Sequence, residues 1–188
     1  MIAGVAAVIV LNGPGGGGGG SSQLPYAVAQ PAIGAVAADF NLPSTSGGSV
    51  TLQSLRGKTV LLYFHEGISC EACWTQMQEI QTSMSQFRAA GIDRVLTITT
   101  NTLSQLQQKA ADEGLTMPVL ADTDFTVSHA YNANTYGMMG TAADGHTFIL
   151  VGPDGTILWR ADYGGPPNYT MNVPVDQLLS AMRAGEHH

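Results

Sequence analysis

The clearest pattern in the chain is an unbroken apolar run followed by an amphipathic one. Val60–Phe64 are five consecutive apolar or aromatic residues, as is typical of a central strand buried on both faces. From Cys70 or Glu71 to about Ala90, apolar positions recur every three or four residues, which predicts a helix: Trp74, Met77, Ile80, Met84 and Phe87. Gly91 then supplies the helix end. A buried strand that turns directly into a helix is the first indication of an α/β fold.

The rest of the chain continues this alternation. Further strands are predicted at 94–99, 118–122, 147–151 and 157–159, and further helices at 102–113, 125–131 and 175–183. Pro153-Asp154-Gly155 is a strong hairpin signal between the last two strands, and 39–43 can pair with 50–52 as a small hairpin. Alternating elements imply parallel neighbours, to which the last hairpin adds antiparallel pairing. We therefore expect an α/β domain with a central mixed sheet flanked by helices.

The first 37 residues differ in composition from the rest of the chain. Residues 2–11 are apolar throughout, about half of the roughly 20 residues that a bilayer span needs. Glycine and serine fill 15–22, and 23–37 is rich in Ala and Pro. We expect 1–37 to be an incomplete membrane anchor plus a linker, 38–185 to be one folded domain, and 186–188 a tail. This organisation predicts an extracytoplasmic, membrane-tethered protein; a disordered apolar tail at 2–11 is the alternative.

Charge narrows the choice of partners. Only 11% of residues are charged, against about 25% in ordinary soluble domains. The formal net charge is −7, and the seven basic residues are scattered along the chain rather than clustered. A nucleic-acid surface needs clustered positive charge. We therefore predict no nucleic-acid partner.

The two cysteines carry the candidate chemistry. Cys70 and Cys73 are the only cysteines of the chain, spaced as CxxC at the predicted strand-to-helix turn. A disulfide that closes so short a loop constrains the unfolded chain weakly, so redox or metal chemistry explains the pair better than stability does. A zinc site would need a second pair of ligands at suitable spacing, which the sequence lacks. We predict a redox-active disulfide that needs no cofactor.

The helix start assigns different roles to the two sulfurs. The free N–H groups and dipole of a helix N-terminus favour a thiolate, but the dipole contributes only about 0.3–1 kcal/mol, less than one pKa unit. Further donors are needed, and first-turn amides and the Cys73 thiol can supply them. Cys70, near the N-cap, should be exposed and reactive. Cys73, one turn in, should be shielded and suited to resolving a mixed disulfide.

Three stretches carry a resemblance to a known family. They read ADFNLP at 38–43, LRGKTVLLYF at 55–64 and TFILVGPDG at 147–155. With the CxxC, they make the chain resemble the thioredoxin superfamily, most of all its peroxiredoxin branch, the alkyl hydroperoxide reductase/thiol-specific antioxidant family. The chain is also similar to the membrane-tethered thioredoxins of cytochrome maturation. The resemblance implies a thioredoxin-like fold for 38–185 with a peroxiredoxin-type N-terminal extension, and a protein dithiol or disulfide, or a hydroperoxide, as partner.

The chain departs from both branches at marker positions. The peroxiredoxin pattern PxxxTxxC, laid on this sequence, puts Glu66 at the Pro, Cys70 at the Thr and Cys73 at the peroxidatic cysteine. The peroxiredoxin arginine and the thioredoxin cis-proline both fall on Gly145 or His146. The resemblance therefore leaves open which sulfur leads. The tryptophan that usually precedes a thioredoxin CxxC is absent, although Trp74 follows the motif.

Other side chains near the motif leave further alternatives open. Glu66 can shuttle a proton for Cys73 or be a solvated carboxylate at a strand end. A copper(I) site would combine Cys70, Cys73 and His146, with softer candidates in the Met-rich loop before His146. Farther along the chain, 159–165 is rich in residue types that bind ligands; the alternative is that Arg160 with Asp162 is only a surface pair.

These patterns together predict an oxidoreductase. In the first interpretation, Cys70 exchanges disulfides with a partner and Cys73 resolves. In the second, Cys73 is the peroxidatic thiol and Cys70 resolves. In the third, a non-enzymatic protein binds copper(I) through Cys70, Cys73 and His146.

Overall fold

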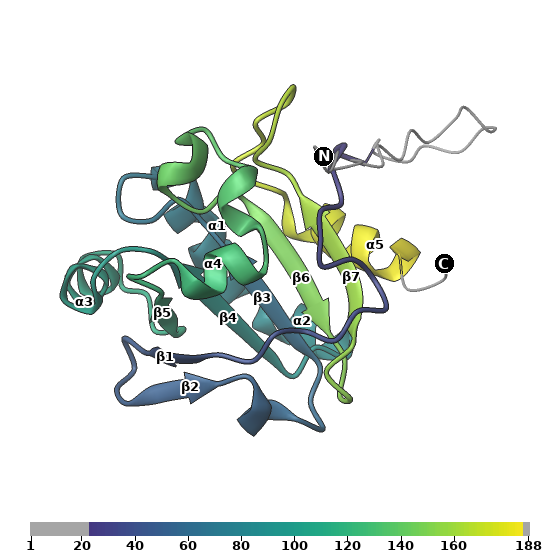
Figure 1. The fold of residues 1–188 in the computed structure, drawn as a ribbon, viewed down its shortest axis with the longest axis horizontal. Helices are drawn as coiled ribbons and strands as arrows, with labels where there is room; N and C mark the ends of the chain where they lie inside the picture. The colour runs from purple at the N-terminus through teal and green to yellow at the C-terminus, as the bar shows by residue number, and fades with distance from the viewer. Residues whose placement is uncertain (1–22, 186–188) are drawn as a thin grey trace, which may run out of the picture.

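A five-stranded mixed sheet forms the centre of the protein. The structure is a computed structural model that describes residues 23–185. The strand order is β5-β4-β3-β6-β7 (Figure 1). The strands are β3 (Val60–Phe64), β4 (Arg94–Thr99), β5 (Val119–Ala121), β6 (Thr147–Val151) and β7 (Ile157–Asp162). A separate two-stranded sheet joins β1 (Asn41–Pro43) to β2 (Ser49–Thr51). The predicted strands and both hairpins are therefore confirmed.

The pairing directions follow from how the strands are connected. β3, β4 and β5 are parallel neighbours, linked through helices. β6 pairs antiparallel with both β3 and β7, and Gly155, at a φ of 80°, takes part in the turn of the β6–β7 hairpin. Every residue of β3 is buried, as the unbroken apolar run predicts. This is the thioredoxin-like arrangement, with β3 and its following helix at the centre.

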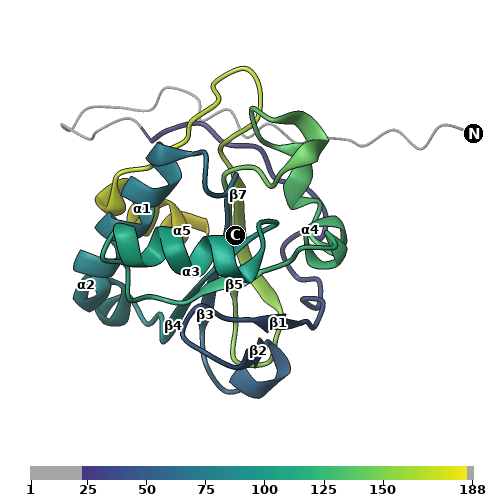
Figure 2. The same ribbon diagram turned by 90° about the vertical axis from the view of Figure 1, so that its left-hand side faces the viewer.

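Helices and loops cover the two faces of the sheet (Figure 2). One face packs against four helices and the other against the short helix α4, the small sheet and part of the N-terminal segment. The helices are α1 (Glu71–Thr82), α2 (Met84–Ala89), α3 (Leu103–Asp112), α4 (Thr126–Ala130) and α5 (Val175–Gly185). Short 3-10 turns lie at Gln53–Leu55, Ala133–Thr135 and Gly140–Ala142. Two apolar cores result, one on each face.

The prediction of one helix from the CxxC to about residue 90 is wrong in one respect, because the structure has two helices there. α1 ends at Thr82 and α2 begins at Met84, with Ser83 between them. The Thr82 hydroxyl donates to the carbonyls of Gln78 and Glu79, and such bonds to the preceding turn compete with the helical ladder and bend helices. The apolar spacing continues across the break, which is why periodicity alone misses it.

The chain makes folded contacts before residue 38, where the sequence predicts the domain to start. Ala27 and Val36 form antiparallel bridges with Asp162 and Thr156 of the β7 region. β7 is an edge strand, whose outer N–H and C=O groups need partners. The segment 24–37 supplies them, so it runs along the sheet edge (Figure 1).

The interpretation of Arg160 and Asp162 as a surface pair is wrong, because both side chains are fully buried. The guanidinium donates to both carboxylate oxygens, at 2.9 and 2.8 Å. The Thr147 hydroxyl and the Ala29 amide also donate to Asp162, and Arg160 reaches the carbonyl of Gln30. The segment 24–37 contributes two of these contacts and covers the pair. The charges are therefore desolvated, and each guanidinium nitrogen and both carboxylate oxygens have a hydrogen-bond partner.

No helix within residues 23–185 is long and apolar enough to span a bilayer. The apolar stretch at 2–11, the glycine run and the tail at 186–188 lie outside the described residues. The membrane anchor and the extracytoplasmic location stay predictions.

Candidate active site

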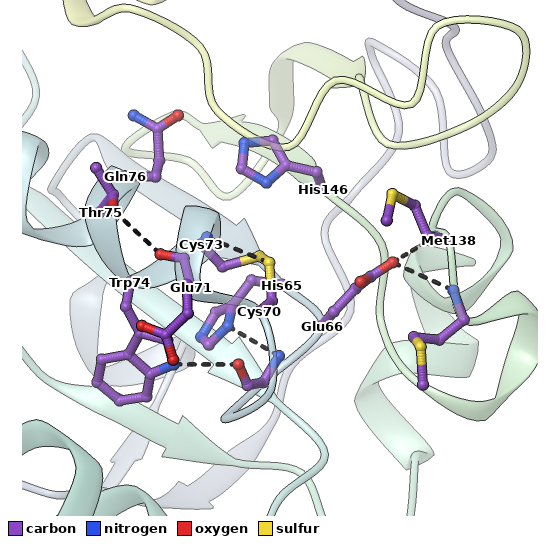
Figure 3. Close-up of a disulfide and its surroundings, with 12 residues drawn as sticks. His65, Glu66, Cys70, Glu71, Cys73, Trp74, Thr75, Gln76, Met138 and His146 are labelled. Atoms are coloured by element: carbon purple, nitrogen blue, oxygen red, sulfur yellow. Dashed lines mark hydrogen bonds between the residues drawn. A yellow bond between two sulfur atoms is a disulfide. The ribbon is translucent and has the colours of Figure 1, made fainter.

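The CxxC opens helix α1 at the end of the central strand. β3 ends at Phe64, a loop of five residues follows, and Cys70 is the N-cap of α1. Cys70 and Cys73 form a disulfide, with Cα atoms 5.3 Å apart (Figure 3). Cys70 is partly exposed, whereas Cys73 is fully buried. The exposed and shielded positions expected of the two sulfurs are those that the structure shows.

One backbone donor reaches the sulfur of Cys70. The Cys73 amide lies 3.2 Å from Cys70 Sγ and donates to it. An N–H bond at a helix N-terminus favours the charged form of the sulfur that accepts it. Within residues 23–185, this is the one hydrogen bond that reaches either sulfur. The one backbone donor at the helix start thus reaches the sulfur of the more exposed cysteine.

Trp74 secures the loop that precedes the motif. Its indole N–H donates to the Gly67 carbonyl at 3.1 Å, and the ring is buried. Lys109 Nζ lies 5.7 Å from the ring centroid and pairs with Glu71 at 2.9 Å. Glu71 is the residue after Cys70, so Lys109 places a positive charge beside the motif from helix α3. Lys109 was not predicted from the sequence, because 38 residues separate it from Glu71.

Glu66 is buried, which overturns its alternative interpretation as a solvated carboxylate. Its carboxylate accepts hydrogen bonds from the amides of Met138 and Met139. Figure 3 shows it turned toward that loop and away from the disulfide. Among the described residues, no hydrogen bond joins Glu66 to either cysteine. Glu66 thus anchors the loop of the two exposed methionines, and its predicted role as a proton shuttle for Cys73 has no contact to support it.

Gly145 occupies a position with no room for a side chain. A Cβ there would overlap the carbonyl of Tyr136, and the Gly145 amide already donates to Ala133 at 2.7 Å. The arginine or cis-proline of related proteins could not be accommodated without moving this loop. The next residue, His146, donates its own amide to Tyr136 at 3.1 Å. Close packing against the Tyr136 carbonyl thus leaves space only for glycine at position 145.

Two fully buried histidines lie beside the motif. His65 follows β3 directly and His146 precedes β6. Burial lowers the pKa of each imidazole to about 3, and for His146 the neighbouring His65 adds to the effect. Both are therefore neutral near pH 7. Burial also raises the pKa of Tyr63, whose hydroxyl lies 2.9 Å from His146 Nδ1.

The residues proposed for copper do not assemble into a metal centre in the disulfide state. Residues 23–185 contain no group of three His, Cys, Asp or Glu side chains that could hold a metal ion. The two sulfurs are bonded to each other, and His146 Nδ1 is held by Tyr63. Met138 and Met139 are exposed on the loop that Glu66 anchors.

The chain matches the sequence profile of the AhpC/TSA family over residues 33–160. A putative peroxiredoxin of Mycobacterium tuberculosis is 33% identical over 124 residues, which is 63% of this chain and 77% of that protein. The thiol-disulfide oxidoreductase ResA of Bacillus subtilis is 26% identical over 125 residues, 66% of this chain and 64% of ResA.

Solved structures show the same fold. Peroxidoxin BcpB of Mycobacterium tuberculosis superposes with a TM-score of 0.65 at 21% identity, over 81% of this chain and 96% of BcpB. AhpC of Enterococcus faecalis gives 0.68 at 14% identity, over 82% and 92%. The solved structures agree with the thioredoxin-like fold, and the profile match and the sequence relatives show that the chain is an oxidoreductase that belongs to the AhpC/TSA family.

Proposed function

We propose that this protein is a thiol–disulfide oxidoreductase in which Cys70 reacts with the partner and Cys73 resolves. The observation that carries the proposal is the asymmetry of the pair. Cys70 is partly exposed, and its Sγ caps helix α1 and accepts the Cys73 amide, whereas Cys73 is fully buried. A protein partner can reach only the first sulfur directly, so exchange begins there.

The proposed reaction has two steps. In the reduced protein, the Cys70 thiolate attacks a partner disulfide, one S–S bond forms, and the leaving partner sulfur takes the electron pair of the broken bond. The Cys73 thiolate then attacks Cys70 Sγ, releasing the second partner sulfur and closing the Cys70–Cys73 disulfide. The partner gains two electrons and the chain loses two. The same steps run in reverse when a partner dithiol is oxidised.

Trapping of the mixed disulfide tests this proposal. We expect Cys73→Ser to accumulate a covalent complex with a disulfide substrate such as insulin, because the resolving thiol is gone. The matched variant Cys70→Ser should form at least about tenfold less complex, since Cys73 is shielded. Non-reducing electrophoresis and mass spectrometry of the linked peptide provide the measurement. Equal trapping by both variants would contradict the proposed order of the two cysteines.

A peroxidase is the second candidate, favoured by the relatives named peroxiredoxins. In this scheme the Cys73 thiolate attacks a hydroperoxide, forming sulfenic acid and releasing an alcohol or water. Cys70 then displaces water from the sulfenic acid to form the disulfide. The burial of Cys73 and the glycine at 145 count against it. Peroxide consumption by the wild type with a donor dithiol, together with a sulfenic acid at Cys73 in Cys70→Ser, would favour this scheme over the first.

A further inference from the structure

The buried imidazoles of His65 and His146 lie opposite each other under helix α1. The antiparallel register of β3 and β6 pairs Phe64 with Thr147, so one residue beyond the strand ends it sets His65 across from His146. The ring of Tyr63 lies 5.3 Å from that of His65 and 4.9 Å from that of His146. Because side chains alternate along strands, both imidazoles share the face of Tyr63, which packs in the core with Trp74 of α1.

The hydrogen bonds at Nδ1 determine where each imidazole carries its proton. The Gly67 amide donates to His65 Nδ1 at 3.2 Å, so the proton of His65 is on Nε2. Tyr63 has a hydroxyl proton to donate, and an imidazole nitrogen is the better acceptor, so His146 Nδ1 accepts and its proton is also on Nε2. Both histidines therefore present an N–H group on the far side of the ring.

Within residues 23–185, neither of these N–H groups has a hydrogen-bond partner. His65 Nε2 and His146 Nε2 are buried without a hydrogen bond, and so is the side-chain nitrogen of Gln76. Gln76 is one turn beyond Cys73 on α1, and its oxygen is held by the Val173 amide at 2.6 Å. Buried donors are rarely left unpaired in folded proteins, because each loses its bond to water without a replacement. The two histidine donors beside the disulfide indicate an acceptor that is not yet formed in the disulfide state.

The acceptor that fits is the Cys73 thiolate. A disulfide sulfur is a poor acceptor, whereas a buried thiolate carries a full charge and requires donors. Cys73 is fully buried, and Figure 3 shows the disulfide between the rings of His65 and His146. We propose that His65 and His146 donate their Nε2–H groups to the Cys73 thiolate when the disulfide opens.

The step needs no proton transfer. When an incoming thiolate attacks Cys70 Sγ, a new S–S bond forms, the Cys70–Cys73 bond breaks, and its electron pair stays on Cys73 Sγ. The two imidazole protons remain on nitrogen and are shared as hydrogen bonds. The other titratable groups near the two rings are Tyr63, which lies against both, Tyr163, whose amide donates to the His146 carbonyl, and Glu66, which follows His65 but points away from the disulfide. The lowered pKa values of both histidines agree with neutral donors near pH 7. The inference rests on the proposed dithiol–disulfide cycle, whichever partner opens it.

The test isolates Cys73 in a Cys70→Ser protein and follows its thiolate by ultraviolet absorbance against pH. We expect His65→Leu to raise the pKa of Cys73 by about one unit, which is a tenfold lower thiolate fraction, and His146→Leu to act in the same direction. His65→Gln keeps an N–H donor in a similar place and should restore most of the effect. Circular dichroism in the near ultraviolet identifies variants that are folded.

The matched control repeats His65→Leu in a Cys73→Ser protein, where Cys70 is the lone thiol. The pKa of Cys70 should change much less, because its donor is the backbone amide at position 73. The inference is overturned if folded His65→Leu and His146→Leu leave the Cys73 pKa unchanged, or if Cys70 shifts as much. A shifted Cys73 pKa in a protein that traps no partner would instead sink the proposed function and leave the inference standing.

Discussion

Two buried polar clusters occupy opposite faces of the same end of the sheet. The arginine cluster consists of Arg160, Asp162 and Thr147, and the histidine pair consists of His65 and His146. His146 and Thr147 are consecutive, so the alternation of β6 sends one side chain to each face. Both clusters are fully or almost fully buried. They differ in how completely their hydrogen bonds are made.

In the arginine cluster, both Asp162 oxygens accept a guanidinium N–H and one further donor each. In the histidine pair, each imidazole has one bonded nitrogen and one that finds no partner among residues 23–185. Complete satisfaction suits a cluster that holds one arrangement, here the segment 24–37 against the sheet edge. Incomplete satisfaction beside a disulfide suits a site whose charge appears only when the bond opens. Hydrogen-bond satisfaction thus separates a structural cluster from a functional one.

The largest loss of stability is expected from a mutation in the arginine cluster. Arg160→Met leaves the Asp162 carboxylate buried without its cation, and breaking such a pair destabilises proteins by about 3–5 kcal/mol. Guanidinium chloride unfolding of the oxidised protein provides the measurement. Arg183→Met, at an exposed position of α5, is the control and should change stability by less than about 0.5 kcal/mol. If Arg160→Met lowers the free energy of unfolding no more than Arg183→Met does, the arginine cluster does not have the stabilising role proposed for it.

The histidine pair should instead reveal itself through pH. Burial lowers the pKa of His65 from 6.5 to about 3, so the stability it contributes is present above 6.5 and is lost as the pH falls toward 3. Between about pH 7.5 and about pH 5, wild type should lose about 2 kcal/mol of unfolding free energy relative to His65→Gln. Chemical denaturation of both oxidised proteins at each pH measures the difference.

Asp144 is a second buried group, and it changes the pH dependence of stability in the opposite direction. The experiment must therefore separate its contribution from that of His65. Burial raises the pKa of Asp144 to about 8, so the stability tied to it is complete below 3.8 and lost as the pH rises through 8. Asp144 is present in both proteins, so the difference between wild type and His65→Gln isolates the histidine. A difference independent of pH would mean that His65 is protonated as easily in the folded as in the unfolded chain.

Local pattern predicts the frame of this molecule and the sulfur pair at its centre. A strand, a helix start and a hairpin each depend on residues that are neighbours in sequence. Local pattern could therefore predict the strand at 60–64, the helix that starts at the CxxC and the hairpin turn at 153–155. The position of each sulfur at the helix start likewise identified Cys70 as the exposed one and Cys73 as the shielded one. Placement of Gly145 and His146 near the motif came from the family resemblance.

Contacts between residues far apart in sequence determine the features that the local sequence pattern could not predict. Arg160 and Asp162 look like surface residues until residues 27–30, some 130 positions earlier, are known to cover them. The sequence shows that His65 continues the alternation of the buried Leu61 and Tyr63. That His146 lies directly across from His65 depends on the register of β3 with β6, which no local pattern gives. Which nitrogens lack partners depends on such non-local geometry.

The smallest loss of stability is expected from a mutation in an exposed cluster of charges, which serves as the reference for the two buried clusters. Lys109 bridges Glu71 and Glu113 at 2.9 and 2.7 Å, and the Glu71 side chain is 74% exposed. Exposed ion pairs contribute about 0–1 kcal/mol, so Lys109→Met should lower the free energy of unfolding by less than about 1 kcal/mol. Added salt should shrink the difference, because it screens exposed charges. Denaturation at low and high salt measures both effects. A loss as large as that of Arg160→Met, or one that salt leaves unchanged, would show that exposure does not set the energetic rank of these clusters.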